Sequence, residues 1–214
     1  MIPEQPVSLA VGPDLSLEAL LAVPDSPTAG VVICHPHPLY GGDMDNPVVV
    51  RIQEVCAPRG FATLRFNFRG VGASGGVHGS GVGEQDDAAA ALDTLAKAIG
   101  NHALAIAGYS FGSRIAALVG GRDGRVAGMA LIAPPLAMSD FDFLEDRRIP
   151  TLAVAGTRDQ YCPPDAFARF AAARPWIKTV AIEGADHFFL GKLFPLGEAV
   201  SEWARRLAPP RGAR

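Results

Sequence analysis

Gly108-Tyr109-Ser110-Phe111-Gly112 directly follows the apolar run 104–107 and precedes a stretch of helical character at 113–118. In this setting the G-x-S-x-G pentapeptide predicts a nucleophile elbow, a strained strand-to-helix turn that exposes a serine hydroxyl. The flanking residues must be very small because the strand and the helix approach each other closely there. Ser110 is therefore the candidate nucleophile.

A serine nucleophile needs a base, and the base needs a carboxylate to orient it. His187 is the candidate base, in a loop between the last predicted strand and the last predicted helix. Asp159 is the candidate acid because it follows the predicted strand 151–156, and catalytic groups gather at such strand ends. Two rival carboxylates have other expected roles. Asp186 should close an Asx-turn beside the base, and Asp165 should lie near a helix start.

The segment His35-Pro36-His37-Pro38 leaves a predicted strand and should pass close to the elbow. An oxyanion hole needs two preorganised N–H donors, and Phe111, just after the nucleophile, supplies one. Since proline has no N–H, the second donor must be His37, Leu39 or Tyr40. The two histidines have no third ligand nearby, so we expect neither a metal nor another cofactor.

Strands and helices alternate along most of the chain. Two strands at 7–11 and 17–23 flank Gly12-Pro13-Asp14, which predicts a hairpin. Further strands are expected at 31–34, 61–68, 104–107, 126–133, 151–156 and 179–183, and helices after Asn46-Pro47, at 84–99, after the elbow, and at 166–173 and 193–207. This order predicts a single α/β domain, 1–214, with a mostly parallel sheet opened by an antiparallel hairpin and helices on both faces. The connection 137–150 is too short for a cap domain.

Two further segments are expected to be structural. The glycine-rich stretch 69–76 lacks the lysine of a phosphate-binding loop, so we interpret it as a loop that packs on the fold. The acidic residues Glu84, Asp86 and Asp87 should complement the N-terminus of the helix that follows. Cys34 ends a buried strand and should be an inert core thiol.

The bulk composition excludes several classes of partner. The 214 residues carry a net charge of −3 with scattered basic residues, which predicts no binding to nucleic acid or to an anionic membrane. Three cysteines without metal spacing, and no visible signal peptide or spanning segment, favour a cytoplasmic protein. The oligomeric state stays open.

Over nearly its full length the chain resembles the α/β-hydrolase superfamily. The features that carry the resemblance are the elbow, Asp159, His187 and the turn at 35–38. It is most similar to small, lidless bacterial hydrolases with His-Pro-His-Pro and Arg-Phe-Asn-Phe-Arg-Gly-Val-Gly segments, related to dienelactone hydrolases and the catalytic domains of prolyl-oligopeptidase-type enzymes. The resemblance implies a triad of Ser110, Asp159 and His187. It also implies Phe111 and His37 as oxyanion donors. Dienelactone hydrolases use a cysteine nucleophile, so Ser110 argues against that activity.

These features predict a serine hydrolase that cleaves small or accessible carboxylic esters through an acyl-enzyme. A peptidase or thioesterase would use the same residues, so the sequence leaves these activities open. A non-catalytic scaffold that binds a ligand or partner is the rival from another class, although it would have no physical need for all three triad residues.

Overall fold

The computed structural model describes residues 2–144 and 147–207. In this part of the chain, one sheet holds the strands in the order β1-β2-β4-β3-β5-β6-β7-β8. The strands are β1 (Gln5–Val11), β2 (Leu15–Ala22), β3 (Ala29–Cys34), β4 (Phe61–Phe66), β5 (Ala103–Tyr109), β6 (Val126–Ile132), β7 (Thr151–Gly156) and β8 (Lys178–Ile182). β1 and β2 form the predicted antiparallel hairpin, and β2 also pairs antiparallel with β4. All the remaining pairs are parallel.

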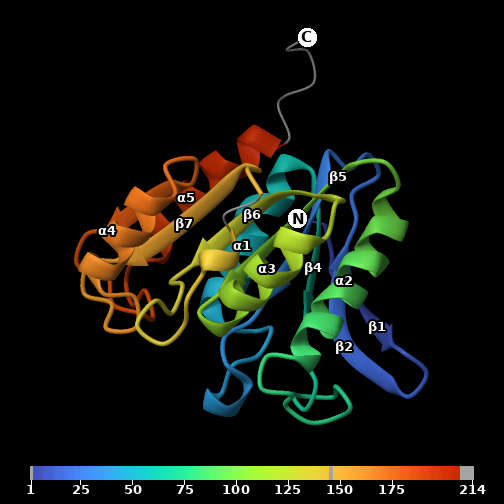
Figure 1. Cartoon of the computed structure of the whole chain (residues 1–214). Helices are drawn as coiled ribbons and strands as arrows, with labels where there is room; N and C mark the ends of the chain where they lie inside the picture. Colours follow the sequence, from blue (N-terminus) through green and yellow to red (C-terminus); the bar gives the residue numbers. More distant parts are fainter. Residues whose placement is uncertain (1, 145–146, 208–214) are drawn as a thin grey trace.

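Helices cover both faces of this sheet (Figure 1). They are α1 (Pro47–Cys56), α2 (Gly83–Ile99), α3 (Phe111–Arg122), α4 (Pro164–Ala173) and α5 (Leu193–Leu207). One hydrophobic core lies between the sheet and α1 with α5, and the other between the sheet and α2, α3 and α4. Because both faces are covered, every residue of β3, β4 and β7 is buried. The predicted α/β-hydrolase architecture is confirmed.

Four predicted strands end one or two residues earlier than expected, at Ala22, Phe66, Ile132 and Ile182, and two of these ends have a clear local cause. The pattern predicts a strand to Phe68, but β4 ends at Phe66 because the Phe68 N–H donates to the His35 side chain instead of to a neighbouring strand. β6 ends before Ala133, which has a positive φ of 45° and cannot continue an extended strand.

The loop that leaves β4, residues 67–82, packs against the hairpin of β1 and β2. The glycine-rich stretch 69–76 is tied to the hairpin, where Gly75 N donates to Ser16 O at 2.9 Å and the Ser74 hydroxyl accepts from Glu18 N at 2.9 Å. This agrees with a structural loop. In the described residues of the 137–150 connection, the regular element is the 3₁₀ turn Asp142–Leu144. The carboxyl ends of the strands are therefore left uncapped by any described segment.

Two acidic residues at the start of α2 form hydrogen bonds to the preceding loop, in addition to any interaction with the helix dipole. Asp87 is buried and accepts hydrogen bonds from Arg69, at 3.0 Å from the backbone N and 2.6 Å from Nη2. Glu84 is also buried and binds N–H groups of the preceding loop. The sequence-based expectation of simple dipole complementation is thus incomplete, because these carboxylates fix the loop that enters the helix.

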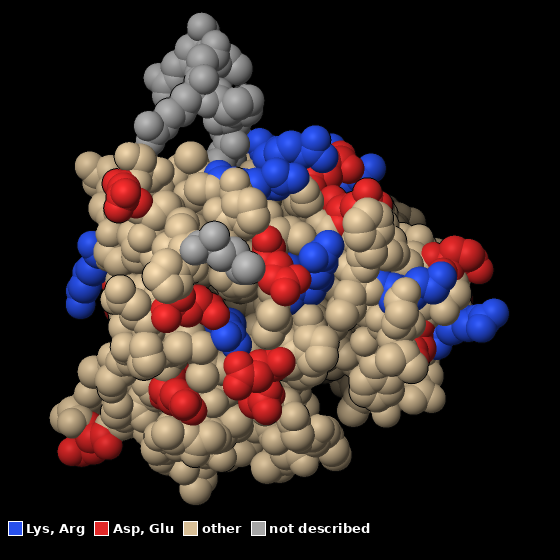
Figure 2. All heavy atoms as spheres, turned by 180° about the vertical axis from the view of Figure 1, so that it is seen from behind, with Lys and Arg blue, Asp and Glu red and all other residues tan. Residues whose placement is uncertain are grey.

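The charged side chains are interspersed on the face that carries α1 and α5. Figure 2 shows Lys and Arg next to Asp and Glu there, with much of the surface formed by uncharged residues. Within the described residues, no helix is long and apolar enough to cross a membrane.

Candidate active site

Ser110 lies on the sharp turn between β5 and α3. Its backbone has φ 54° and ψ −118°, a conformation that costs energy for any residue other than glycine. Both glycines of the pentapeptide are sterically required. A Cβ on Gly108 would lie 2.0 Å from Gly112 O, and a Cβ on Gly112 would lie 2.4 Å from Cys34 O. The predicted nucleophile elbow is therefore present as a backbone geometry, with the serine partly exposed.

A continuous hydrogen-bonded chain joins the three candidate triad residues. His187 Nε2 lies 2.9 Å from Ser110 Oγ, and His187 Nδ1 lies 2.8 Å from Asp159 Oδ2. The Asp159 side chain is fully buried and that of His187 is 7 % exposed. Loops after β5, β7 and β8 supply these residues. His187 is 77 positions from Ser110 and 28 positions from Asp159 in the chain, yet all three meet at one edge of the sheet.

Local hydrogen bonds fix the carboxylate. Asp159 Oδ1 accepts from Tyr161 N at 2.8 Å and from Cys162 N at 2.9 Å, so the carboxylate faces the imidazole in one orientation. The two other carboxylates considered as the acid have different partners. Asp186 Oδ1 accepts from the backbone N–H groups of residues 188 and 190, the expected Asx-turn, and Asp165 pairs with an arginine of α4.

Aromatic side chains enclose the imidazole. The His187 ring centroid lies 4.7 Å from that of Tyr161, 5.6 Å from Tyr109 and 5.7 Å from Phe188. The Tyr109 hydroxyl also donates to His187 O at 2.9 Å. Burial, reinforced by the Asp159 carboxylate, raises the pKa of Tyr109, which keeps this hydroxyl protonated as a donor.

His35 anchors the turn that passes beside the elbow. Its side chain is buried, its Nε2 accepts from Phe68 N at 3.0 Å, and its Nδ1 lies 2.6 Å from Pro36 O. Since Nε2 is an acceptor, the proton must be on Nδ1, which donates to the carbonyl. Burial lowers the pKa of His35 to about 4, so the ring is neutral near neutral pH. With both nitrogens engaged, His35 has no lone pair for a metal. No group of three potential metal ligands occurs in the described residues.

The hydrogen bonds of the turn separate the three candidates for the second oxyanion donor. Leu39 N donates to His37 Nδ1 at 3.2 Å, and Tyr40 N donates to His37 O at 3.1 Å. Neither Phe111 N nor His37 N donates to a hydrogen-bond acceptor within residues 2–144 and 147–207. Phe111 is the first residue of α3, where backbone N–H groups have no partner inside the helix. These two N–H groups are therefore available to a ligand.

Several residues of this region had no signal in the sequence. Tyr109 and Tyr161 neighbour the candidate triad along the chain, yet nothing in their spacing indicates that both rings contact His187. His78 and Glu84, discussed below, come together only when the loop before α2 folds. Cys34 is buried as expected, and burial raises the pKa of its thiol, which opposes a nucleophilic role.

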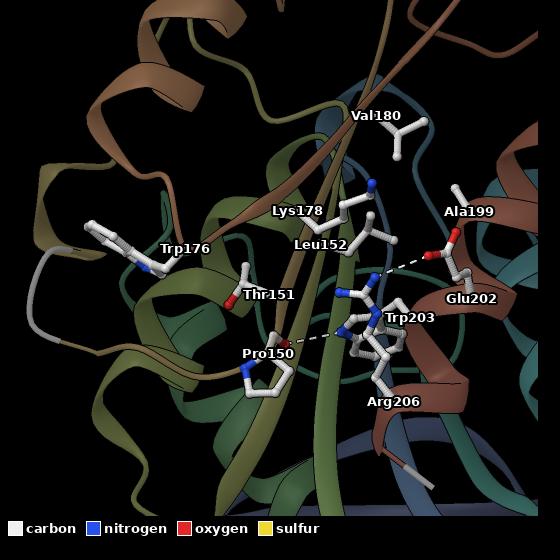
Figure 3. A pocket seen from close by; sticks show the side chains of 10 residues that line it. All are labelled: Pro150, Thr151, Leu152, Trp176, Lys178, Val180, Ala199, Glu202, Trp203 and Arg206. Atoms are coloured by element: carbon white, nitrogen blue, oxygen red, sulfur yellow. Dashed lines mark hydrogen bonds and ion pairs between the residues drawn. The ribbon is translucent and has the colours of Figure 1, made fainter. Parts of the chain in front are cut away.

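A small cavity of about 60 Å³ lies away from this site, between β7, β8 and α5 (Figure 3). Its lining includes Thr151, which begins β7, and Trp203, whose Nε1 donates to Pro150 O at 3.1 Å. Asp159 follows the other end of β7. At a rise of roughly 3.3 Å per residue, the six-residue strand separates the two places by ~20 Å. The cavity therefore does not belong to the serine site.

Comparisons with known proteins identify the family of the chain. A model of the alpha/beta hydrolase domain matches residues 28–193. An uncharacterized protein of Rickettsia prowazekii, RP471, is 36 % identical over 203 residues, covering 90 % of this chain and 85 % of its own. The crystal structure of XC6422 from Xanthomonas campestris, described as an α/β serine hydrolase without lid, has a TM-score of 0.88 at 28 % identity and covers 96 % of this chain and 95 % of its own. An α/β serine hydrolase homologue from Coxiella burnetii has a TM-score of 0.83 at 35 % identity, covering 92 % and 96 %. The chain therefore belongs to the alpha/beta hydrolase family.

Proposed function

We propose that the protein is a serine hydrolase that cleaves carboxylic esters through an acyl-enzyme, with Ser110 as nucleophile, His187 as base and Asp159 as acid. The observation that carries this proposal is the hydrogen-bonded chain from Ser110 Oγ through His187 to the buried Asp159 carboxylate. A carboxylate on Nδ1 leaves Nε2 free to accept the hydroxyl proton, as this chemistry requires.

The reaction follows from these positions. His187 Nε2 takes the Ser110 proton as Oγ attacks the ester carbonyl carbon, and the resulting oxyanion accepts from Phe111 N and His37 N. Asp159 stabilises the imidazolium, which then protonates the departing alcohol as its bond to the acyl carbon breaks. A water molecule attacks the acyl-enzyme in the same way, losing its proton to His187. The acid is released and the proton returns to Ser110 Oγ.

The surroundings of the site support a neutral, apolar substrate. All the exposed large hydrophobic side chains of the described residues lie in segments that follow the carboxyl ends of strands, where the serine also lies: Leu39, Tyr40, Val77, Val82, Met138, Tyr161, Phe188, Leu190 and Phe194. With no cap over them, these side chains offer contact area but no deep acyl tunnel. Short-chain esters should therefore be preferred, without activation at a lipid interface.

Labelling with a fluorescent fluorophosphonate tests the nucleophile directly. The wild-type protein should be labelled and should hydrolyse p-nitrophenyl acetate, and Ser110→Ala should lose both properties while remaining folded by circular dichroism. Ser26→Ala, which changes an exposed serine far from the elbow in sequence, is the matched control and should keep both. A folded Ser110→Ala variant with full activity would rule out the proposal.

A panel of substrates with one acyl group and different leaving groups then tests the bond that is cleaved. Faster turnover of the amide or thioester than of the ester would point to a peptidase or thioesterase using the same residues. Absence of both labelling and turnover in the wild-type protein would favour a non-catalytic scaffold.

A further inference from the structure

The loop between β4 and α2 brings a third histidine to the candidate oxyanion donors. The ring of His78 has its centroid 4.9 Å from that of His37 and 5.7 Å from that of Phe111. The His37 and Phe111 rings are themselves 4.9 Å apart. These three side chains form a closed set of contacts, which we call the ring triangle. Two of its members are the residues whose backbone N–H groups have no acceptor among the described residues.

Glu84 holds the loop that carries His78. Its carboxylate is fully buried and accepts from Gly79 N at 2.7 Å and from Gly81 N at 2.8 Å. Burial alone would raise the pKa of Glu84, but these backbone donors more than compensate and lower it, so the carboxylate stays ionised. His78 Nδ1 lies 2.8 Å from Glu84 Oε1, outside the angular range of a hydrogen bond, so the ring packs against this carboxylate.

Packing leaves the His78 ring little freedom. Its side chain is 12 % exposed and contacts Glu84 as well as the other two rings. The two N–H donors come from segments that are remote in the chain, the turn after β3 and the first residue of α3. The backbones of these segments meet at Gly112, where a Cβ would lie 2.4 Å from Cys34 O, and the ring contacts continue this packing to the residues that carry the two N–H groups. Stabilisation of an oxyanion requires the distance between these N–H groups to be set before the reaction begins.

We propose that His78 is a positioning residue for the oxyanion hole: its ring, held by Glu84, keeps the His37 turn and the Phe111 helix start at a fixed separation. The inference rests on the proposed function, because it assigns those two N–H groups to the oxyanion. The ring acts through its neighbours and does not contact the reacting atoms.

Removing the ring tests this role. In His78→Ala, kcat for p-nitrophenyl acetate, normalised to titrated active sites, should fall by roughly ten- to a hundredfold, while KM stays within about twofold. The inhibition constant of a boronic acid that forms a tetrahedral adduct should rise by the same factor as kcat falls. Normalisation matters because a purely structural defect would reduce the number of active sites and leave the remaining sites unchanged.

Three further variants complete the experiment. His78→Phe keeps a flat ring and should recover most of the lost kcat, whereas His78→Asn keeps a polar group towards Glu84 without the ring and should be as impaired as alanine. The asparagine variant also serves if alanine does not fold. Ala73→Ser, which changes an exposed residue of the same loop outside the ring triangle, should behave as wild type.

Unchanged kcat in the folded alanine or asparagine variant would overturn the inference. So would a rise in KM at constant kcat, which would mean that the ring binds the substrate. A phenylalanine variant as slow as alanine would exclude ring packing as the cause. Ser110→Ala, measured in parallel, separates the two proposals. If it is inactive while His78→Ala is normal, only this inference fails, and if it is fully active, the proposed function itself fails.

Discussion

The buried, neutral His35 should make the protein less stable in mild acid. Its pKa is about 4 in the folded protein because of burial, against about 6.5 for an exposed histidine. A depressed pKa means that the unfolded state binds the proton more readily. Stability is therefore complete above the unfolded value and is lost as the pH falls from roughly 6.5 to 4. Over the whole interval the loss from this one group is about 3 kcal/mol.

The effect can be isolated by comparing the wild type with His35→Gln. Glutamine does not titrate, and its amide oxygen can still accept from Phe68 N, although the bond to Pro36 O is lost. Between pH 7 and pH 5 the free energy of unfolding of the wild type should fall by about 2 kcal/mol more than that of the variant. The other ionisable groups are common to both proteins and cancel in this difference.

Urea unfolding followed by far-ultraviolet circular dichroism at the two pH values gives the four free energies needed. At pH 7 the variant should be less stable by roughly 1 kcal/mol, the usual contribution of one hydrogen bond. If the two proteins lost the same stability between pH 7 and pH 5, His35 would not be a neutral buried anchor of the turn.

Three further changes test the carboxylate, the elbow and the second donor. Asp159→Asn should lower kcat by roughly 10⁴ because the imidazole loses its orienting carboxylate. Asp186→Asn should lower mainly the melting temperature. If steady-state kinetics showed the large loss of kcat in Asp186→Asn instead, Asp186 would be the acid. Gly112→Ala should abolish or severely impair folding, since its Cβ would lie 2.4 Å from backbone carbonyl oxygens. In Gly121→Ala the nearest neighbour of the new Cβ would be 4.0 Å away, so this variant should stabilise α3 by about 0.5–1 kcal/mol. Equal melting temperatures for the two alanine variants would contradict this account of the elbow. His37→Pro suits the observed φ of −57° but removes the N–H, so kcat should fall on the order of 10²–10³, well beyond the effect of His37→Ala. A folded proline variant with normal kcat would place the second donor elsewhere.

Local features of the sequence were sufficient for the architecture and for the three candidate triad residues. The hairpin, the alternation of strands and helices, and the elbow depend on signals within a few residues of one another, such as Gly12-Pro13-Asp14 or the glycines around Ser110. Asp159 and His187 could be chosen because parallel strands bring their carboxyl ends to one edge, so residues after such strands meet without further information.

Contacts that form only in the folded structure decided the rest. The chain could not show that β4 ends at Phe66, since the reason is a hydrogen bond from Phe68 N to His35, 33 residues away. Leu39, Tyr40 and His37 were equivalent as donors until the folded turn occupied the first two N–H groups. The link from Glu84 through His78 to both candidate donors likewise has no sequence pattern. Periodicity and spacing report which elements form, whereas the choice among neighbouring polar groups depends on which partners the packed structure places within hydrogen-bonding distance.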